Sequence, residues 1–326
     1  MSNEAVPMTP SEAVQQRLRE LKIVLDPEID YRLEQVFPKL KGWGANRTIK
    51  RRAKLIRLVE PTLYHMLLAG EEVLYVAKGV QYSLAENYFM GALWSTLLNQ
   101  TVFVLTNARL LMMRSNNWGK PSEMFWVVYY SEIANFKASW TGVLKLNLQD
   151  KKQLKFTGFP AQDRKTMPAI FQQALDDYRR LNFAPFASQS RENLCCRCFK
   201  VVSKGDFVCS HCGTQYWTPR GLALRSLVFP SWGDFCMKHY FLASAELACY
   251  LLSWTVAITR FADNDSEGAV AIVVMILLFE NSFDAILTYL IARKGLNHRR
   301  DRHPDQPQPD AGEKNHFADA DGATTY

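Results

Sequence analysis

The stretch Leu194–Gln215, "LCCRCFKVVSKGDFVCSHCGTQ", decides the organisation of the fold, because the chain before it and the chain after it differ in character. It places five of the seven cysteines within eighteen positions. The spacing Cys195-x2-Cys198-x10-Cys209-x2-Cys212 puts two pairs of thiolates on short turns, as a tetrahedral Zn²⁺ site with four sulfur ligands requires. Such a site has no open position, so the predicted zinc stabilises structure and catalyses nothing.

This cysteine pattern resembles a zinc ribbon over residues 191–218. The resemblance has one irregularity: Gly213 closes the second turn, whereas the first turn lacks a glycine and carries a surplus thiol, Cys196. Cys196 could replace Cys195 as a ligand. A disulfide framework is the alternative, but paired CxxC units fit a metal better, and an odd number of cysteines would leave one thiol over. Reduced cysteines indicate a reducing compartment.

Two long apolar segments follow the ribbon. Residues 240–259 contain one charged residue and residues 268–292 contain two, so each could cross a hydrocarbon core of about 30 Å as a helix. A pair of buried helices in a soluble domain is the alternative. Basic residues flank the outer ends of both segments, whereas the connection "RFADNDSE" has one arginine against three acids. By the positive-inside rule we expect a multi-pass protein with both termini cytoplasmic.

We expect the chain that leads into the first apolar segment to bend at Pro230. Together with the two segments it forms a predicted membrane hairpin over residues 222–295. The string Pro230-Ser231-Trp232-Gly233-Asp234-Phe235 resembles the Pro-Gly-x-Gly motif that precedes the two helices of small bacterial membrane domains, with Ser231 in place of the first glycine. Three acids fall inside the segments, namely Glu246, Glu280 and Asp284.

Acids at membrane depth are costly, so they need a partner. Glu280 and Asp284 are four residues apart and should face one side, and Asp284 could meet Glu246 across the hairpin. We expect either that at least one acid is protonated or that a cation lies between them. A purely structural helix pair, with the acids satisfied by neighbouring polar groups, stays open as the alternative.

Residues 70–185 have a different organisation, with β-rich runs followed by one helical stretch. The string Leu105-Thr106-Asn107-Ala108-Arg109-Leu110-Leu111 and the later Tyr130-Ser131-Glu132-Ile133 resemble strands of the GRAM and bacterial PH-like family. The resemblance implies an α+β barrel with a C-terminal helix. Residues 83–100 are longer than the usual hairpin connection and predict an inserted amphipathic helix.

The positive charge is concentrated before that domain. The chain carries a net charge of +7, and its helical N-terminal region, residues 1–69, contains a stretch with eight basic residues and no acid. We expect this stretch to contact anionic lipid, with a solvated helix face as the alternative and nucleic acid as the least favoured partner. The eight residues are Lys39, Lys41, Arg47, Lys50, Arg51, Arg52, Lys54 and Arg57.

The sequence contains no nucleotide-binding, serine-hydrolase or metalloprotease motif, so we expect no enzyme. Residues 297–326 are polar and rich in proline, which predicts a disordered tail. We therefore expect a multidomain, membrane-anchored binding or scaffold protein with a PH-like module, a structural Zn²⁺ ribbon and an unidentified protein partner. The alternative is a small membrane protein that responds to ions or protons through its intramembrane carboxylates.

Overall fold

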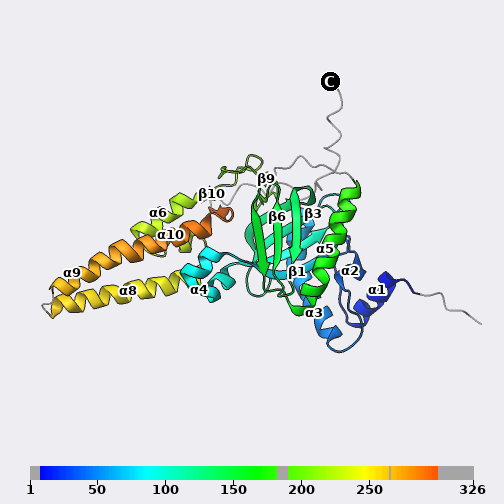
Figure 1. Cartoon of the computed structure of the whole chain (residues 1–326), viewed down its shortest axis with the longest axis horizontal. Coiled ribbons are helices and arrows are strands. Elements are labelled where there is room, and N and C mark those ends of the chain that lie inside the picture. The colour runs from blue at the N-terminus through cyan, green and yellow to red at the C-terminus, as the bar shows by residue number, and fades with distance from the viewer. Residues whose placement is uncertain (1–7, 182–189, 264–265, 300–326) are drawn as a thin grey trace, which may run out of the picture. The chain divides into compact units, whose positions relative to one another are not determined.

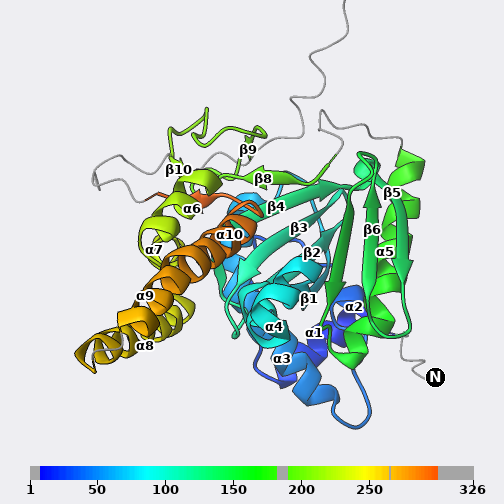
Figure 2. The same cartoon turned by 60° about the vertical axis from the view of Figure 1, so that its left-hand side comes forward.

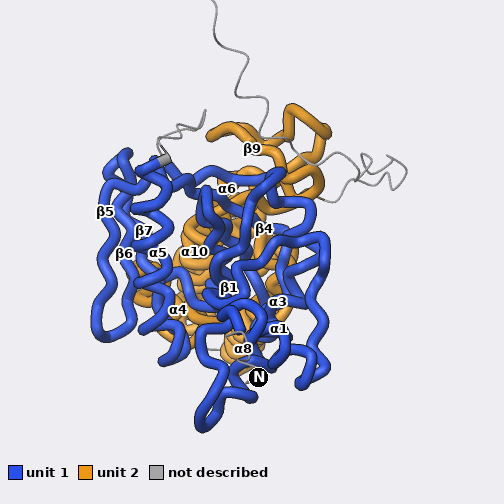
Figure 3. The backbone as a smooth tube through the Cα atoms, turned by 90° about the vertical axis from the view of Figure 1, so that its right-hand side faces the viewer, with its two compact units in different colours: residues 1–82, 99–194, 307–326 blue, residues 83–98, 195–306 orange. Residues whose placement is uncertain are grey.

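The computed structural model describes residues 8–181, 190–263 and 266–299. The chain divides into two compact units (Figure 3). Unit 1 contains Met1–Tyr82 and Asn99–Leu194, and unit 2 contains Ser83–Leu98 and Cys195–Gln306. The N-terminal helices therefore belong to the same unit as the sheet.

In the described residues the sheet is antiparallel and has nine strands in the order β5-β6-β7-β1-β2-β3-β4-β8-β9. Figure 2 labels all of them except β7. This order is open at both ends, whereas the sequence predicted a barrel. The chain turns from β4 into β5 through the short 3₁₀ helix η1 (Tyr130–Glu132). The strands are β1 (Val73–Gln81), β2 (Gln100–Thr106), β3 (Arg109–Ser115), β4 (Pro121–Tyr129), β5 (Ile133–Ala138), β6 (Leu144–Leu148), β7 (Gln153–Thr157), β8 (Glu192–Leu194) and β9 (Val201–Val202).

β1 joins the two halves of this sheet. It pairs with β2 over most of its length, and near its end Val80 and Gln81 pair with β7. Gly79 makes the change of partner sterically feasible, because a Cβ there would lie 2.8 Å from the Phe159 ring and 2.9 Å from the Thr157 carbonyl oxygen. Both halves of the sheet therefore cover one core.

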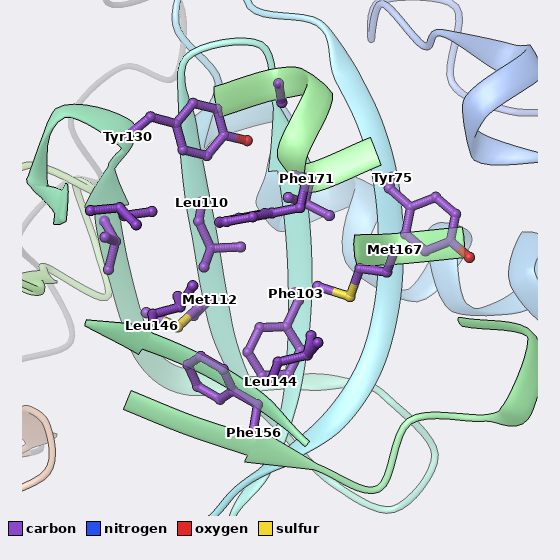
Figure 4. Close-up of a cluster of buried hydrophobic side chains, with 14 of the residues drawn as sticks. Tyr75, Phe103, Leu110, Met112, Tyr130, Leu144, Leu146, Phe156, Met167 and Phe171 are labelled. Carbon is purple, nitrogen blue, oxygen red and sulfur yellow. The ribbon is translucent and has the colours of Figure 1, made fainter. Parts of the chain in front are cut away.

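The core is filled by side chains from the strands and from helix α5 (Ala161–Leu181), as Figure 4 shows. The ring of Phe103 lies 4.7 Å from that of Phe156, and Phe171 on α5 lies 5.6 Å from Tyr130. These contacts join both halves of the sheet to the terminal helix, which confirms the predicted α+β class.

Three helices precede the sheet in unit 1. They are α1 (Pro10–Glu20), α2 (Leu33–Val36) and α3 (Ala45–Met66). Ile49, Ile56 and Leu63 recur every seven residues on α3 and are buried, because that spacing keeps them on one face of a helix. The basic residues Lys50, Arg51, Lys54 and Arg57 are left on the other face, whereas Arg52 is buried.

Unit 2 is mainly helical, and its two longest apolar helices lie side by side in Figure 1. Tyr240–Ala262 has 23 residues and Glu267–Ala292 has 26. In the most apolar stretch of 18 residues, only 17% of the first helix and 28% of the second is buried. Two such helices are weak evidence for membrane association, since core helices of soluble proteins can be equally long and apolar. The elements are α4 (Leu84–Leu98), β10 (Tyr216–Trp217), α6 (Pro219–Val228), α7 (Trp232–Cys236), α8 (Tyr240–Ala262), α9 (Ser266–Met275), the π-helical turn η2 (Ile276–Glu280), α10 (Asn281–Ala292) and β11 (Asn297–His298).

Helix α4 is the segment that links β1 to β2, yet it belongs to unit 2. The Trp94 ring lies 5.3 Å from Phe241 on α8, and Glu86 forms a 2.6 Å ion pair with Lys294. The sequence predicted an amphipathic helix here. In the structure the helix bends at Gly91, and the exposed side chains Leu84 and Tyr88 are apolar or aromatic.

Candidate functional site

The four predicted zinc ligands lie on two turns of the same shape. The Phe199 amide donates to the Cys195 carbonyl at 3.1 Å, and the Gly213 amide donates to the Cys209 carbonyl at 2.9 Å. Both turns close on a residue with positive φ, 55° at Phe199 and 71° at Gly213. The missing glycine of the first turn is therefore replaced by a phenylalanine in the conformation that glycine adopts most easily.

The four sulfur atoms form a compact cluster whose members lie within 4.8 Å of one another. Cys195 Sγ lies 3.5 Å from Cys212 Sγ, and Cys198 Sγ lies 3.6 Å from Cys209 Sγ. Ligands at 2.3 Å from a tetrahedral zinc would be about 3.8 Å apart. A disulfide would need about 2.05 Å, and all four cysteines are free. The cluster fits a possible Cys₄ metal site, and no disulfide joins these four residues in the structure.

Tyr216 helps to distinguish Cys195 from its neighbour Cys196. Its hydroxyl donates to Cys195 Sγ at 3.0 Å and accepts from the Cys196 amide at 3.0 Å. Hydrogen bonds from Cys196 and Cys198, with a further one from Tyr216, lower the pKa of the Cys195 thiol, which favours the thiolate that a metal needs. Cys195 is the member of the cluster, so Cys196 is the surplus thiol.

The cysteine segment is tied to the chain that follows α10. Tyr216 pairs with His298 and Trp217 pairs with Asn297, which joins β10 to β11. Leu296 packs among the cysteines in the same buried cluster. The predicted tail thus begins with two strand residues, and its positions 300–326 lie outside the described residues.

A second cluster brings together three carboxyl groups from three helices. Asp234 of α7, Glu246 of α8 and Asp284 of α10 each offer an oxygen, and these atoms lie within 4.8 Å of one another. The structure therefore places Glu246 beside Asp284. Glu280 is not part of the cluster. Its carboxyl group instead accepts a 2.6 Å hydrogen bond from the Ser253 hydroxyl.

Asp234 is the member that the sequence reasoning missed, because it was assigned to a bend outside the apolar segments. Its side chain is fully buried, and it is bonded to His239 Nδ1 at 3.0 Å and to Thr288 Oγ1 at 3.1 Å. Glu246 and Asp284, inside the apolar segments, already required a polar partner. The sequence signal for that partner was the pair Gly233-Asp234 just before the first segment, with His239 five residues after the aspartate.

Gly233 and Ser231 shape the chain around these acids. A Cβ at Gly233 would lie 2.5 Å from Thr288 and 2.7 Å from the Ser226 hydroxyl, so only glycine fits. Ser231 adopts a positive φ of 69°, and its amide donates to Asp284 Oδ2 at 2.7 Å. Ser231 therefore adopts a backbone conformation that favours glycine, and it adds a buried hydroxyl group.

Seven of the eight predicted lipid-contacting residues are exposed in unit 1: Lys39, Lys41, Arg47, Lys50, Arg51, Lys54 and Arg57. Lys54 lies 5.8 Å above the ring of Trp118, which is 76% exposed in the β3–β4 hairpin. Arg52 is different. It is buried, it donates to the Val36 carbonyl and the Tyr75 hydroxyl, and it forms an ion pair with Asp163, so it has no group free for a lipid.

One comparison with known proteins matches a range that lies in unit 1 except for the α4 segment. Residues 65–170 match the family described as "Intermembrane lipid transfer protein VPS13, C-terminal", so the chain contains a VPS13 C-terminal-like domain. The match includes neither the cysteine segment nor the two long helices, and it does not name the GRAM or PH-like family that the sequence suggested.

Solved structures add little to this match. No curated protein matches the chain. A crystal structure of the C-terminal domain of an unknown protein from Leishmania infantum is 16% identical, and the similarity covers 40% of this chain and 97% of that one. Its TM-score of 0.25 is too low to support a structural argument.

Proposed function

We propose that the protein is a membrane-anchored binding or scaffold protein whose unit 1 associates with lipid at the cytoplasmic face of a bacterial inner membrane. The observation that carries the proposal is the match of residues 65–170 to a lipid-transfer family. The PH-like module that the sequence suggested would bind lipid rather than catalyse a reaction. An unidentified protein partner would complete the scaffold.

The packing of unit 1 favours contact with lipid headgroups over enclosure of an acyl chain. The space between the two halves of the sheet is occupied by large rings, including the fully buried Phe103, Phe156 and Phe171. A lipid would therefore meet the outside of the unit. The exposed basic face of α3 suits an anionic membrane surface, where each lysine or arginine contributes about 1 kcal/mol.

Anchoring through the two long helices is the second part of the proposal. Most of their apolar surface is exposed in unit 2, as expected for helices covered by lipid. Basic residues outside both helices favour cytoplasmic ends, and the reduced cysteines belong on the same side.

Structural Zn²⁺ is the third part. Bound by Cys195, Cys198, Cys209 and Cys212, it would fix the two turns that precede β10, the strand that pairs with β11 and leads into α6. The metal would thereby hold the cytoplasmic ends of the helical unit together.

A vesicle-capture experiment with the full-length protein tests the lipid role. The protein is inserted into phosphatidylcholine nanodiscs, and capture of vesicles containing phosphatidylserine is measured by flotation. We expect capture that falls as salt rises, because exposed charges are screened over about 8 Å at physiological ionic strength. Replacing Arg47, Lys50, Arg51 and Lys54 with Gln should abolish capture.

The matched control removes four positive charges from the β6–β7 hairpin of the same unit, by replacing Lys145, Lys151, Lys152 and Lys155 with Gln. Capture should persist in this control. Equal loss in both variants would mean that net charge alone is responsible, and no capture by the unaltered protein would reject the lipid role.

A further inference from the structure

We propose that Asp234, Glu246 and Asp284, together with the Ser231 hydroxyl, bind one divalent cation of the oxygen-preferring class that includes Ca²⁺, Mg²⁺ and Mn²⁺. All four residues belong to unit 2. The site stands apart from the lipid role, because no residue of the basic face takes part in it.

Oxygen atoms without partners inside the cluster point to a ligand. Asp284 Oδ1 and Glu246 Oε2 are shielded from solvent and have no hydrogen-bond partner in the part of the chain that the structure describes. Asp284 is 5% exposed. An unpaired buried carboxylate oxygen is costly, so a bound group that satisfies it would stabilise the helices.

The Ser231 hydroxyl is a second and independent observation. Ser231 is fully buried, its Oγ has no close hydrogen-bond partner among the described residues, and a longer hydrogen-bonding contact joins it to the Glu246 carboxyl group. A glycine would adopt the positive φ of this position at lower cost. The hydroxyl is therefore directed at the carboxyl cluster from a position where the backbone alone does not require a serine.

A cation can satisfy more of the carboxylate oxygens than one shared proton. One proton joins two oxygens, whereas Asp234, Glu246 and Asp284 together offer three. A cation can accept Asp284 Oδ1, Glu246 Oε2 and Ser231 Oγ at the same time, with Asp234 as a further ligand.

The ligand set also indicates the class of cation. Carboxylate and hydroxyl oxygens suit Ca²⁺, Mg²⁺ and Mn²⁺, whereas zinc and copper prefer the sulfur or imidazole ligands found elsewhere in the chain. Three donor atoms no more than 4.8 Å apart can surround a central ion at up to about 2.8 Å, a limit that includes the range for Ca²⁺.

Hydrogen bonds around the cluster already hold its carboxyl groups in place. Asp234 is bonded to His239 and Thr288, and Thr288 in turn contacts the Ser226 hydroxyl at 2.9 Å. Such outer contacts orient metal ligands in proteins. The site therefore combines fixed carboxyl groups with two buried oxygens, Asp284 Oδ1 and Glu246 Oε2, that have no hydrogen-bond partner among the residues that the structure describes.

Mn²⁺ binding to the full-length protein in detergent tests the site. The protein is first loaded with Zn²⁺, so that the cysteine cluster is filled, and bound Mn²⁺ is then measured by electron paramagnetic resonance. We expect one Mn²⁺ per chain, its displacement by Ca²⁺, and a higher melting temperature with either ion than with an equal ionic strength of choline chloride.

Variants locate the ion. Asp284→Asn and Glu246→Gln should each weaken Mn²⁺ binding at least tenfold. Ser231→Gly should weaken Mn²⁺ binding severalfold, although glycine adopts the positive φ of this position at lower cost. Glu280→Gln is the matched control, because it removes the same charge from the same apolar segment outside the cluster and should leave binding unchanged.

Three results would overturn the proposal: no saturable binding of Mn²⁺ or Ca²⁺, binding that survives in Asp284→Asn with Glu246→Gln, or equal loss in Glu280→Gln. If the carboxyl variants do not fold, Ser231→Gly decides, since unchanged affinity in that variant would contradict the assigned ligand set. If the unaltered protein binds no ion and the double variant is more stable, the acids are protonated and structural.

Discussion

Arg52 shows how one residue in a basic run can differ from its neighbours. The sequence indicated a uniform lipid-contacting stretch, because charge alone does not reveal which face of a helix is buried. In the structure the period of α3 turns Arg52 inward, where it joins Tyr75 and Asp163 in one buried network. Its role is to connect α3 and α5 to the sheet.

Arg52→Ala should therefore destabilise unit 1 by about 3 to 5 kcal/mol, because it leaves the buried Asp163 carboxylate without its partner. Hydrogen exchange of the β1 and α5 amides in the full-length protein measures this loss. The neighbouring exposed variant Arg51→Ala should change the exchange by less than about 0.5 kcal/mol. Similar effects of both variants would contradict the buried network.

Phe199 supports a prediction about the first zinc turn. Replacing it with either Gly or Ala removes the ring, so the comparison between those two variants isolates the positive φ of 55°. Phe199→Gly should be about 1 kcal/mol more stable than Phe199→Ala in the zinc-bound form. Zinc competition with a chelator should show this as a severalfold higher affinity.

Gly213→Ala offers the counterpart at the second turn, where φ is 71° and space for a Cβ is open. It should lower zinc affinity by a similar factor. An alanine at position 199 that holds zinc as tightly as a glycine there would show that the turn is not strained.

The β2–β3 hairpin marks what the sequence could predict about the elements. The run around Leu105–Leu111 correctly predicts β structure, but it predicts a single strand. The chain in fact reverses at Asn107 and Ala108, where the Thr106 hydroxyl accepts hydrogen bonds from the Ala108 and Arg109 amides. A turn held by a threonine side chain lacks the glycine or proline that marks most reversals.

For α4, the sequence predicts the helix but not the helices that it contacts. Its position as a helical insertion was visible in the sequence, and so was its apolar composition. Its partners were not, because α8 and α10 lie more than a hundred residues further along the chain. Asp234 escaped notice for the same reason, since contacts with Glu246 and Asp284 form only when three helices pack.

Excision of α4 tests its assignment to the helical unit. Replacing residues 83–98 with Asn-Gly should leave the β1–β2 pairing intact, because Val80 already pairs with Gln100 next to the insertion. The contacts of Trp94 with Phe241 and of Glu86 with Lys294 would be lost, which should increase hydrogen exchange in α10. The reverse pattern, with β1 unprotected and α10 unchanged, would place α4 in unit 1.

The division of the whole chain into two units predicts that loss of metal is confined to one of them. We expect one Zn²⁺ per chain by elemental analysis, and none in Cys209→Ser. Because folding of the cysteine segment is coupled to metal binding, this variant should lose protection in residues 195–217 while β1–β7 keep theirs. Loss of protection throughout the sheet would show that the two units fold as one.

The order of synthesis gives the placement of α4 a further meaning. The ribosome makes this helix long before α10, with roughly 190 residues in between. Because the ribosome adds about 5 to 20 residues per second, roughly 10 to 40 s pass between the synthesis of α4 and that of its last partner. Leu84, Tyr88 and Leu93 are exposed even in the finished unit, so during this interval they need a lipid surface or a chaperone. A nascent chain that reaches the bilayer through α4 would deliver the later helices to the place where they must insert.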